Sequence, residues 1–299
     1  MEARKQILGH LAAIFTISIW GISFISIKVL LIPFAPVEIM VYRLVLAVLA
    51  LTIASPPGLP SARLDRQALR DELKIMAAGL CGVTLYSLFQ NIALTYTLAA
   101  NVSVLISIAP LFIALVSRLF LNEKLKASFF IGFAAAITGI ILIAFNGSMV
   151  LKLNPLGDLL SILAALVWAF YSVLIKKINP PQSALLAVTR KIFFYGLLFV
   201  LPVLPLFRFR LGLERLAELP NLLNLVLLGV VASALCLVTW NFAVHRLGPV
   251  KTSIYIYLGP VVTIVASLLV LHEPVTLVAG IGMALILVGM VLSERQQVN

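Results

Sequence analysis

Apolar residues along this chain gather into ten long runs, and the short stretches between them hold most of the charged and turn-forming residues. Each run is long enough to cross about 30 Å of hydrocarbon as an α-helix. The runs cover residues 8–32, 36–54, 74–97, 100–121, 127–146, 155–178, 183–205, 221–244, 249–271 and 275–293. The pattern therefore predicts an all-α integral membrane protein with ten transmembrane helices.

Composition supports a membrane protein. Hydrophobic residues make up 62% of the 299 residues, charged residues make up 11%, and the mean hydropathy is +1.14. Soluble domains contain about 45–50% apolar and about 25% charged residues. Cys81 and Cys236 lie inside apolar runs, which argues against a disulfide framework or a zinc cluster. Arg4 and Lys5 precede the first run as in a secretion signal, but this run is longer and others follow, so we expect an uncleaved helix.

The net charge is +11, but the basic residues are scattered between the apolar runs and form no stripe. We therefore expect the lipid bilayer, and no nucleic acid, as a partner. Most Lys and Arg residues of the connections fall on one side of the membrane, so the positive-inside rule puts both termini in the cytoplasm. The basic residues expected on the other side are Lys152, Arg208, Arg210 and Arg215. Three of them lie in the connection 206–220, which fits the rule least well.

The second half of the chain repeats the order of landmark residues in the first half. Adding 150 relates Gly79 to Gly229, Asn91 to Asn241, Ser103 to Ser253, Pro110 to Pro260 and Glu123 to Glu273. The offset narrows to 147–148 upstream, where the pairs are Trp20 with Trp168 and Arg43 with Arg190. Self-similarity over this length predicts two copies of one structural unit, residues 1–146 and 155–293.

Each predicted copy holds five spans. Because five is odd, the second copy enters the membrane from the opposite side, which makes the copies inverted repeats. Inverted repeats are characteristic of secondary transporters that bind substrate near the membrane midplane, where the copies meet. We therefore expect a central cavity and transport by alternating access. The plain alternative is that duplication only produced a stable helix bundle.

Polar and aromatic side chains within the spans are candidates for the cavity wall, because such groups are costly in lipid unless they face protein or water. The candidates are Trp20, Ser23, Tyr86, Gln90, Asn91, Ser103, Ser107, Trp168, Tyr171, Trp240, Ser253 and Tyr257. Each also has a structural interpretation, since a lone Ser can bond its own helix and a Trp or Tyr can anchor at the membrane interface.

The two copies differ in the depth at which these candidates lie. Inversion places an outer cluster in the outer half of the membrane and an inner cluster in the inner half. The outer cluster is Ser23, Gln90 and Ser103, and the inner cluster is Tyr171, Trp240 and Tyr257. We expect the inner cluster to be a cytoplasmic gate that closes by aromatic packing.

Prolines and charges inside spans need separate interpretations. Pro110 and Pro260 interrupt two spans at equivalent places and are candidate hinges, although fixed kinks would explain them too. For Arg43 and Arg190 a structural role is the favoured interpretation. No acidic residue lies mid-span, so nothing in the sequence demonstrates proton coupling, and energy coupling stays open. We expect no metal and no cofactor. The candidates for the cavity wall are aromatic, hydroxyl and amide side chains, which favour a neutral or zwitterionic, partly apolar cargo. A phosphorylated cargo would need several inward Lys or Arg residues.

Small residues at four-residue spacing mark the fifth and tenth spans, as Gly132 with Ala136 and Gly280 with Ala284. Such spacing allows close helix approach. Packing between the halves is the favoured interpretation, and a homodimer contact is the alternative.

Several short motifs recur in both copies: Trp20-Gly21, Pro110 followed by Asn122-Glu123-Lys124, and their echo in Pro260 and His272-Glu273-Pro274. With these motifs the chain resembles the drug/metabolite transporter superfamily, and in particular its EamA-type bacterial exporters with two five-helix units. Within that group it is most similar to the aromatic and broad-range amino-acid exporters. The resemblance implies ten helices, an inner-membrane location, a central cavity and amino-acid efflux.

Two other functions stay open. A carrier of nucleotide sugars or phosphorylated metabolites would share this fold and would direct Arg43 and Arg190 inward. An intramembrane enzyme is disfavoured because the chain has no His-Glu-x-x-His motif and no close acid pair in a span. The histidines, which lie near span ends, are His10, His245 and His272.

Overall fold

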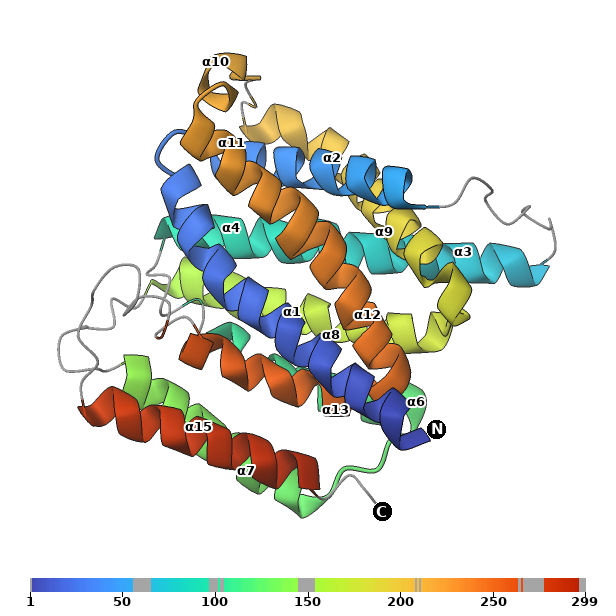
Figure 1. The fold of residues 1–299 in the computed structure, drawn as a ribbon, viewed down its shortest axis with the longest axis vertical. Coiled ribbons are helices and arrows are strands. Elements are labelled where there is room, and N and C mark those ends of the chain that lie inside the picture. Colours follow the sequence, from blue (N-terminus) through green and yellow to red (C-terminus); the bar gives the residue numbers. More distant parts are fainter. Residues whose placement is uncertain are drawn as a thin grey trace.

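The structure is a computed structural model that describes residues 2–55, 66–96, 102, 105–144, 154–207, 209, 211–262, 265 and 277–295. Every regular element in these ranges is a helix (Figure 1). The first half contains α1 (Glu2–Leu30), α2 (Pro36–Ala54), α3 (Arg66–Gly79), α4 (Tyr86–Tyr96), α6 (Ala109–Leu121) and α7 (Ala127–Ala144). The second half contains α8 (Pro155–Ile178), α9 (Leu185–Val200), α10 (Leu213–Leu216), α11 (Leu219–Val226), α12 (Cys236–Leu247), α13 (Pro249–Ser253) and α15 (Leu277–Arg295).

Short non-α helices interrupt or extend these elements. A π-helix at Leu80–Leu85 joins α3 to α4, and a second at Leu227–Leu235 joins α11 to α12. Short 3₁₀-helices lie at Gln182–Ala184, Leu201–Phe207 and Ile254–Tyr257. The predicted span 74–97 is therefore one long helical rod from Arg66 to Tyr96 that changes its winding in the middle.

Six of the described helical segments are long and apolar enough to cross a membrane. They are Gln6–Ile27, Pro36–Ala54, Leu69–Tyr96, Pro155–Ile178, Gln182–Leu206 and Leu219–Leu247. Ala109–Leu121, Ala127–Leu142 and Gly280–Ser293 are shorter apolar helices. The predicted spans 100–121 and 249–271 lie only partly within the described ranges. The described parts contain α6 in the first span, and α13, the 3₁₀-helix Ile254–Tyr257 and the helical residues 258–262 in the second.

Helix contacts come in pairs that exchange the two halves. α1 lies beside α12 (Figure 1), and its counterpart α8 packs on α4. α2 packs against the π-helix Leu227–Leu235, and its counterpart α9 packs against the π-helix Leu80–Leu85. α2 also contacts α9, and α6 contacts α13. Each half therefore presents equivalent faces to the other.

α7 and α15 form a close pair along one edge of the molecule (Figure 1). A Cβ atom at Gly132 would lie 2.6 Å from the carbonyl oxygen of Gly289, and one at Gly139 would lie 2.4 Å from that of Gly282. Residue numbers fall along α15 as they rise along α7, so the two helices are antiparallel. The contact at Gly132 follows the small-residue prediction. A Cβ atom at Gly280 would meet no atom within 4 Å, so the glycines that α15 places against α7 are Gly282 and Gly289 instead of Gly280.

The small-residue faces of α7 and α15 are consequently used within the chain. Their opposite faces carry exposed apolar side chains, including Phe130, Ile131 and Leu287, as expected for helices that face lipid. A homodimer through these helices stays a prediction, and it would have to use those outward faces.

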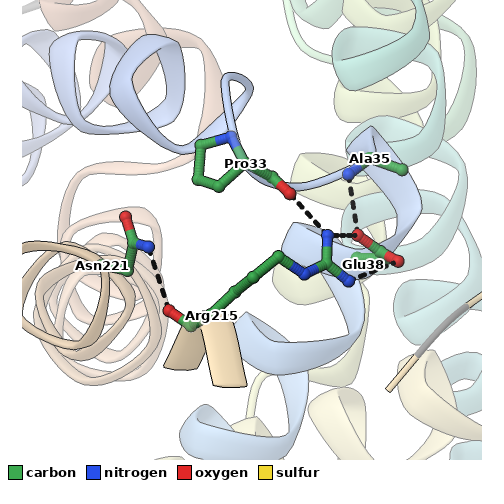
Figure 2. A network of polar contacts seen from close by, with 5 residues as sticks. All are labelled: Pro33, Ala35, Glu38, Arg215 and Asn221. Atoms are coloured by element: carbon green, nitrogen blue, oxygen red, sulfur yellow. Dashed lines mark hydrogen bonds and ion pairs between the residues drawn. The ribbon is translucent and has the colours of Figure 1, made fainter. Parts of the chain in front are cut away.

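Arg215 in α10 joins the turn after α1 to the start of α11 (Figure 2). Its Nη1 donates to the carbonyl of Pro33 at 2.5 Å and to Glu38 at 3.1 Å. The Glu38 carboxylate also accepts from the backbone N–H of Ala35 at 2.9 Å, and Asn221 donates to the Arg215 carbonyl at 2.9 Å. Glu38 is only 4% exposed, so Arg215 neutralises a carboxylate that would otherwise be costly to bury. This role gives a structural reason for an arginine that the charge rule placed awkwardly.

Candidate transport cavity

Two π-helices position the residues at the centre of the bundle. They occupy equivalent places in the two repeats, because adding 150 to the residue numbers of Leu80–Leu85 gives positions within Leu227–Leu235. A π-helix widens the helical turn and releases backbone carbonyls to other donors. In the second π-helix, the carbonyl of Ala232 accepts from the indole Nε1 of Trp20 at 2.7 Å. In the first π-helix a side chain is the donor, because Thr84 Oγ1 donates to the carbonyl of Gly196 in α9 at 2.8 Å. Each π-helix is thereby tied to a helix of the other half.

All three tryptophans of the chain meet in one aromatic cluster. The ring centroids of Trp20 and Trp168 are 5.3 Å apart, those of Trp20 and Trp240 are 5.4 Å apart, and those of Trp168 and Trp240 are 5.8 Å apart. Tyr86 and Tyr171 each lie 4.9 Å from Trp168. Centroid separations of about 4.5–7 Å give favourable ring contacts. The cluster therefore joins α1 and α4 of the first half to α8 and α12 of the second.

A cavity of about 110 Å³ lies against this cluster. Trp20, Tyr86 and Trp168 line it, together with residues of α2, α9 and both π-helices, so both halves contribute to its wall. This volume is enough for several water molecules. Polar side chains in the wall are Ser23, Arg43, Ser87, Gln90, Ser107 and Ser233.

Arg43 is the only Lys, Arg, Asp or Glu among the described residues that line the cavity. It lies about two turns into α2 and is half-buried. Its Nε and Nη2 donate to Ser233 Oγ at 3.2 and 3.1 Å. Within the described ranges no carboxylate lies at ion-pair distance from this guanidinium. Arg190, its repeat counterpart, does not line the cavity.

Next to the cavity, the aromatic cluster continues into a sealed region formed by Tyr171, Trp240 and Asn241. Tyr171 and Trp240 are both 0% exposed. Tyr171 Oη donates to Asn241 Oδ1 at 2.5 Å, and Asn241 Nδ2 donates to Thr189 Oγ1 at 3.1 Å. The Tyr171 ring rests on Gly82, where a Cβ atom would come within 2.2 Å of the ring. Glycine at position 82 is therefore required for this close approach.

A second contact between the halves lies nearer to the start of α1. His10 Nδ1 and Tyr255 Oη are 2.5 Å apart, and the two rings meet edge-on with centroids 5.8 Å apart. Gly9 also lies against Leu247 at the end of α12. The sealed region and the His10–Tyr255 contact therefore close the bundle toward the end at which α1 begins. The candidates for the cavity wall include neither His10 nor Tyr255. The sequence signal for this contact is that each is a polar residue near the end of a predicted span.

The structure separates the sequence candidates into two groups. Those that line the cavity are Trp20, Ser23, Tyr86, Gln90, Ser107 and Trp168, and those that do not are Asn91, Tyr171, Trp240, Ser253 and Tyr257. Ser103 lies outside the described residues. Both described members of the outer cluster are in the first group, and all three members of the inner cluster are in the second.

Three candidates have local roles that differ from the prediction. Tyr257 packs with residues of α7 and α15 in an apolar cluster of its own, so the inner cluster is not one contact group. Ser253 Oγ donates to the Val250 carbonyl of its own helix at 2.7 Å. Asn91 Nδ2 donates to the Pro36 carbonyl at 3.1 Å and ties α4 to the start of α2.

The two candidate hinge prolines follow interruptions of regular α-helix. Pro110 stands in the first turn of α6, directly after a turn at residues 107–108. Pro260 follows the 3₁₀-helix Ile254–Tyr257 and lines the cavity. Proline suits such positions because its ring fixes φ and a first turn needs no N–H donor from it. In both halves, the interruption of the α-helix therefore lies a few residues before the proline.

Comparison with known proteins identifies the group to which these features belong. The EamA-like transporter family matches the chain twice, over residues 7–145 and 155–294. The chain belongs to the EamA-like transporter family. This places it in the drug/metabolite transporter superfamily and makes it a membrane protein with two EamA repeats. The membership also favours transport over enzymatic catalysis.

Relatives of this EamA protein are described as transporters. A "Probable terminal-alkyne amino-acid exporter" of Streptantibioticus cattleyicolor is 29% identical and covers 95% of this chain and 93% of its own. An "Uncharacterized transporter" of Archaeoglobus fulgidus is 26% identical over 94% of this chain and 97% of its own. The "Uncharacterized inner membrane transporter YedA" of Escherichia coli is 24% identical over 96% and 91%. A crystal structure of a protein 18% identical covers 99% of both chains with a TM-score of 0.73, so the fold is shared.

Two lining residues of the EamA protein are absent from the candidates, although the sequence carries a signal for them. Ser87 and Ser233 line the cavity and are hydroxyls in the middle of spans, which is the property that selected the other candidates. The π-helices have no compositional signature, because a π-turn arises from an added residue in a regular helix and not from a residue type.

Proposed function

We propose that this EamA protein exports amino acids or similar small metabolites across the bacterial inner membrane by alternating access. The observation that carries the proposal is the cavity between the two halves. Its wall combines Trp20, Tyr86 and Gln90 of the first half with Trp168 of the second. A site built by both halves changes its access when the halves rock against each other.

Inverted repeats of five spans each are part of the proposal. The antiparallel packing of α7 on α15 supports inversion, because an axis in the membrane plane makes equivalent helices antiparallel where they meet. The exchange of helix contacts between the halves supports it as well. We expect topology reporters fused after residues 146 and 178 to lie on opposite sides of the membrane. Reporters on the same side would refute the inversion.

The sealed region is the proposed cytoplasmic gate, with both termini in the cytoplasm. Its closure leaves polar atoms without partners in the described residues, namely Trp240 Nε1 and, in the neighbouring cluster, Tyr257 Oη. Each buried unpaired group costs about 1–3 kcal/mol. Opening to water would satisfy these groups and offset part of the lost aromatic packing. Pro110 and Pro260 are the proposed hinges.

The cavity inventory supports an amino-acid cargo more than a phosphorylated one. Aromatic rings line it together with hydroxyl and amide groups, and one relative is named as an amino-acid exporter. A nucleotide sugar would require several inward cations, and Arg43 is the one described in the wall, since Arg190 is not there. An intramembrane enzyme is less well supported than either carrier, because the described lining residues include no acid or histidine for proton transfer.

Counterflow in proteoliposomes tests this function. Vesicles loaded with unlabelled leucine, phenylalanine or tryptophan are expected to accumulate the labelled amino acid only when they contain the protein. A panel of nucleotide sugars and sugar phosphates serves as competitors. Competition by the phosphorylated compounds and not by amino acids would favour the alternative carrier.

A further inference from the structure

We propose that Arg43 binds the carboxylate of the transported molecule and thereby makes a carboxylate a requirement for recognition. This inference rests on the proposed transport function and assigns the charged end of its substrate. The cavity contains an arginine, and no described residue supplies its counter-charge.

Two ion pairs elsewhere in the described structure provide a contrast. Arg215 is paired with Glu38 at 3.1 Å, and Lys191 is paired with Glu72 at 2.6 Å. Arg43 instead donates twice to one neutral hydroxyl, Ser233 Oγ. A charged side chain at lipid depth is costly unless it is paired or serves a function. Arg43 thus carries a charge that a bound anion would compensate.

The hydrogen bonds of Arg43 leave some of its guanidinium N–H donors for such an anion. A guanidinium has five N–H donors in a planar fork. Nε and Nη2 are directed to Ser233 Oγ, whereas Nη1 has no acceptor among the described residues. Ser233 therefore fixes the plane of the fork while donors remain for the cavity. A carboxylate matches a guanidinium in a two-point contact, and a single arginine suits one carboxylate better than a diphosphate.

The rest of the wall accommodates the remainder of a carboxylate-bearing molecule. Trp20, Tyr86 and Trp168 present aromatic surface for an apolar side chain. Gln90 lines the same cavity and supplies an amide group to its wall. An amide oxygen and aromatic ring faces are both suitable neighbours for an ammonium group. The substrate class is therefore a small carboxylate with an apolar portion, of which neutral amino acids are one case.

Intrinsic fluorescence provides a binding readout that is independent of transport. Trp20 and Trp168 line the cavity, Trp240 packs on both, and the chain contains no other tryptophan. Quenching of the purified protein therefore reports occupancy of this site. The probes are matched acid and amide pairs, leucine with leucinamide and 3-phenylpropanoate with 3-phenylpropanamide, together with phenyl phosphate.

Arg43→Gln, Arg43→Lys and Arg190→Gln form the variant set. We expect the wild-type protein to bind each acid at least about tenfold more tightly than its amide, in line with the strength of charge-assisted hydrogen bonds. Arg43→Gln should lose this preference, and Arg43→Lys should keep part of it. Arg190→Gln is the matched control, because it removes the repeat-equivalent arginine outside the cavity, and it should keep the full preference. Thermal unfolding confirms that the variants are folded.

The outcomes separate this inference from the proposed function. An unchanged acid-to-amide ratio in folded Arg43→Gln, no preference in the wild type, no quenching by any probe, or stronger binding of phenyl phosphate would each overturn the carboxylate site. If amino acids fail in counterflow while 3-phenylpropanoate still binds through Arg43, amino-acid export is wrong and the carboxylate site stands. If amino acids are exchanged equally well by wild type and Arg43→Gln, export stands and the carboxylate site is wrong.

Discussion

Equivalent asparagines in the two halves have different surroundings. Both polar side-chain atoms of Asn241 have partners, because its Oδ1 accepts from Tyr171 and its Nδ2 donates to Thr189. Asn91 uses only its Nδ2, and its buried Oδ1 has no partner in the described part of the chain. The repeat counterpart of Tyr171 is Ser23, whose hydroxyl bonds the Trp20 carbonyl and lines the cavity. A large side chain therefore fills in one half the position that stays small in the other.

The same contrast holds one turn away. Trp240 in the sealed region corresponds to Gln90 in the cavity wall at the repeat offset of 150. Two positions thus differ in size and polarity while the backbone around them is repeated, π-helices included. Burying each large aromatic side chain stabilises the sealed region by about 1.5–3 kcal/mol. We infer that these side chains, and not the scaffold, select the end of the bundle that closes in this conformation.

Giving the first half the residue of the second is the strongest way to break the contrast. In Ser23→Tyr a phenol ring would enter the cavity, where overpacking costs about 1–3 kcal/mol and the substrate loses its space. We expect counterflow to fall by about tenfold or more, which corresponds to about 1.4 kcal/mol. Proteoliposome counterflow measures the change.

Ser18→Tyr is the matched control for Ser23→Tyr. Ser18 lies on the same helix, is only partly buried and does not line the cavity. The Ser18→Tyr variant should therefore retain near wild-type transport. Full activity of Ser23→Tyr at normal expression would show that the cavity does not hold the substrate.

Removing the large side chain from the second half should open the sealed region. Truncation of a buried aromatic residue costs about 3–5 kcal/mol, so Tyr171→Ala should lower the thermal unfolding midpoint. Cys236 is 0% exposed and lies in α12, one turn before Trp240, so it reports access to this region. In a Cys81→Ala background, a water-soluble thiol reagent should modify Cys236 faster in Tyr171→Ala than in the parent. Phe170→Ala, which removes an exposed neighbouring ring, should change neither measurement.

A smaller change tests the hydrogen bond alone. Tyr171→Phe keeps the ring on Gly82 but leaves Asn241 Oδ1 without its donor, as Asn91 Oδ1 is in the first half. An unsatisfied buried acceptor costs about 1–3 kcal/mol, so the unfolding midpoint should fall less than in Tyr171→Ala. Tyr96→Phe, at an exposed tyrosine, is the control. An equal loss in Tyr171→Phe and Tyr171→Ala would mean that the hydroxyl, and not the ring, closes the region.

Physical reasons explain which features the sequence could reveal. Hydrophobic run length and repeated landmarks predict helices and duplication directly, because both depend on residue type and order. The depth of a residue in the membrane follows from counting residues along its helix. Counting therefore assigned Ser23 and Gln90 to one half of the membrane and Tyr171 and Trp240 to the other. The direction of a side chain around its helix was less accessible. The π-helices Leu80–Leu85 and Leu227–Leu235 change the direction of the side chains that come after them in the same helix. Tyr257 is the last residue of a 3₁₀-helix and packs with residues of α7 and α15.

The smallest expected effect comes from Glu123, which lies between α6 and α7 outside the spanning helices. Burial raises the pKa of its carboxyl above the ordinary value near 4.5, and Lys176 opposes the shift only in part. The folded state therefore favours the protonated form, so the wild type should lose stability relative to Glu123→Gln as the pH rises above that ordinary value. We expect a divergence of no more than about 2 °C in unfolding midpoints between pH 4 and pH 8. Glu214→Gln at an exposed site controls for the loss of one charge, and a wild type that gains stability over Glu123→Gln with rising pH would mean that Lys176 outweighs burial.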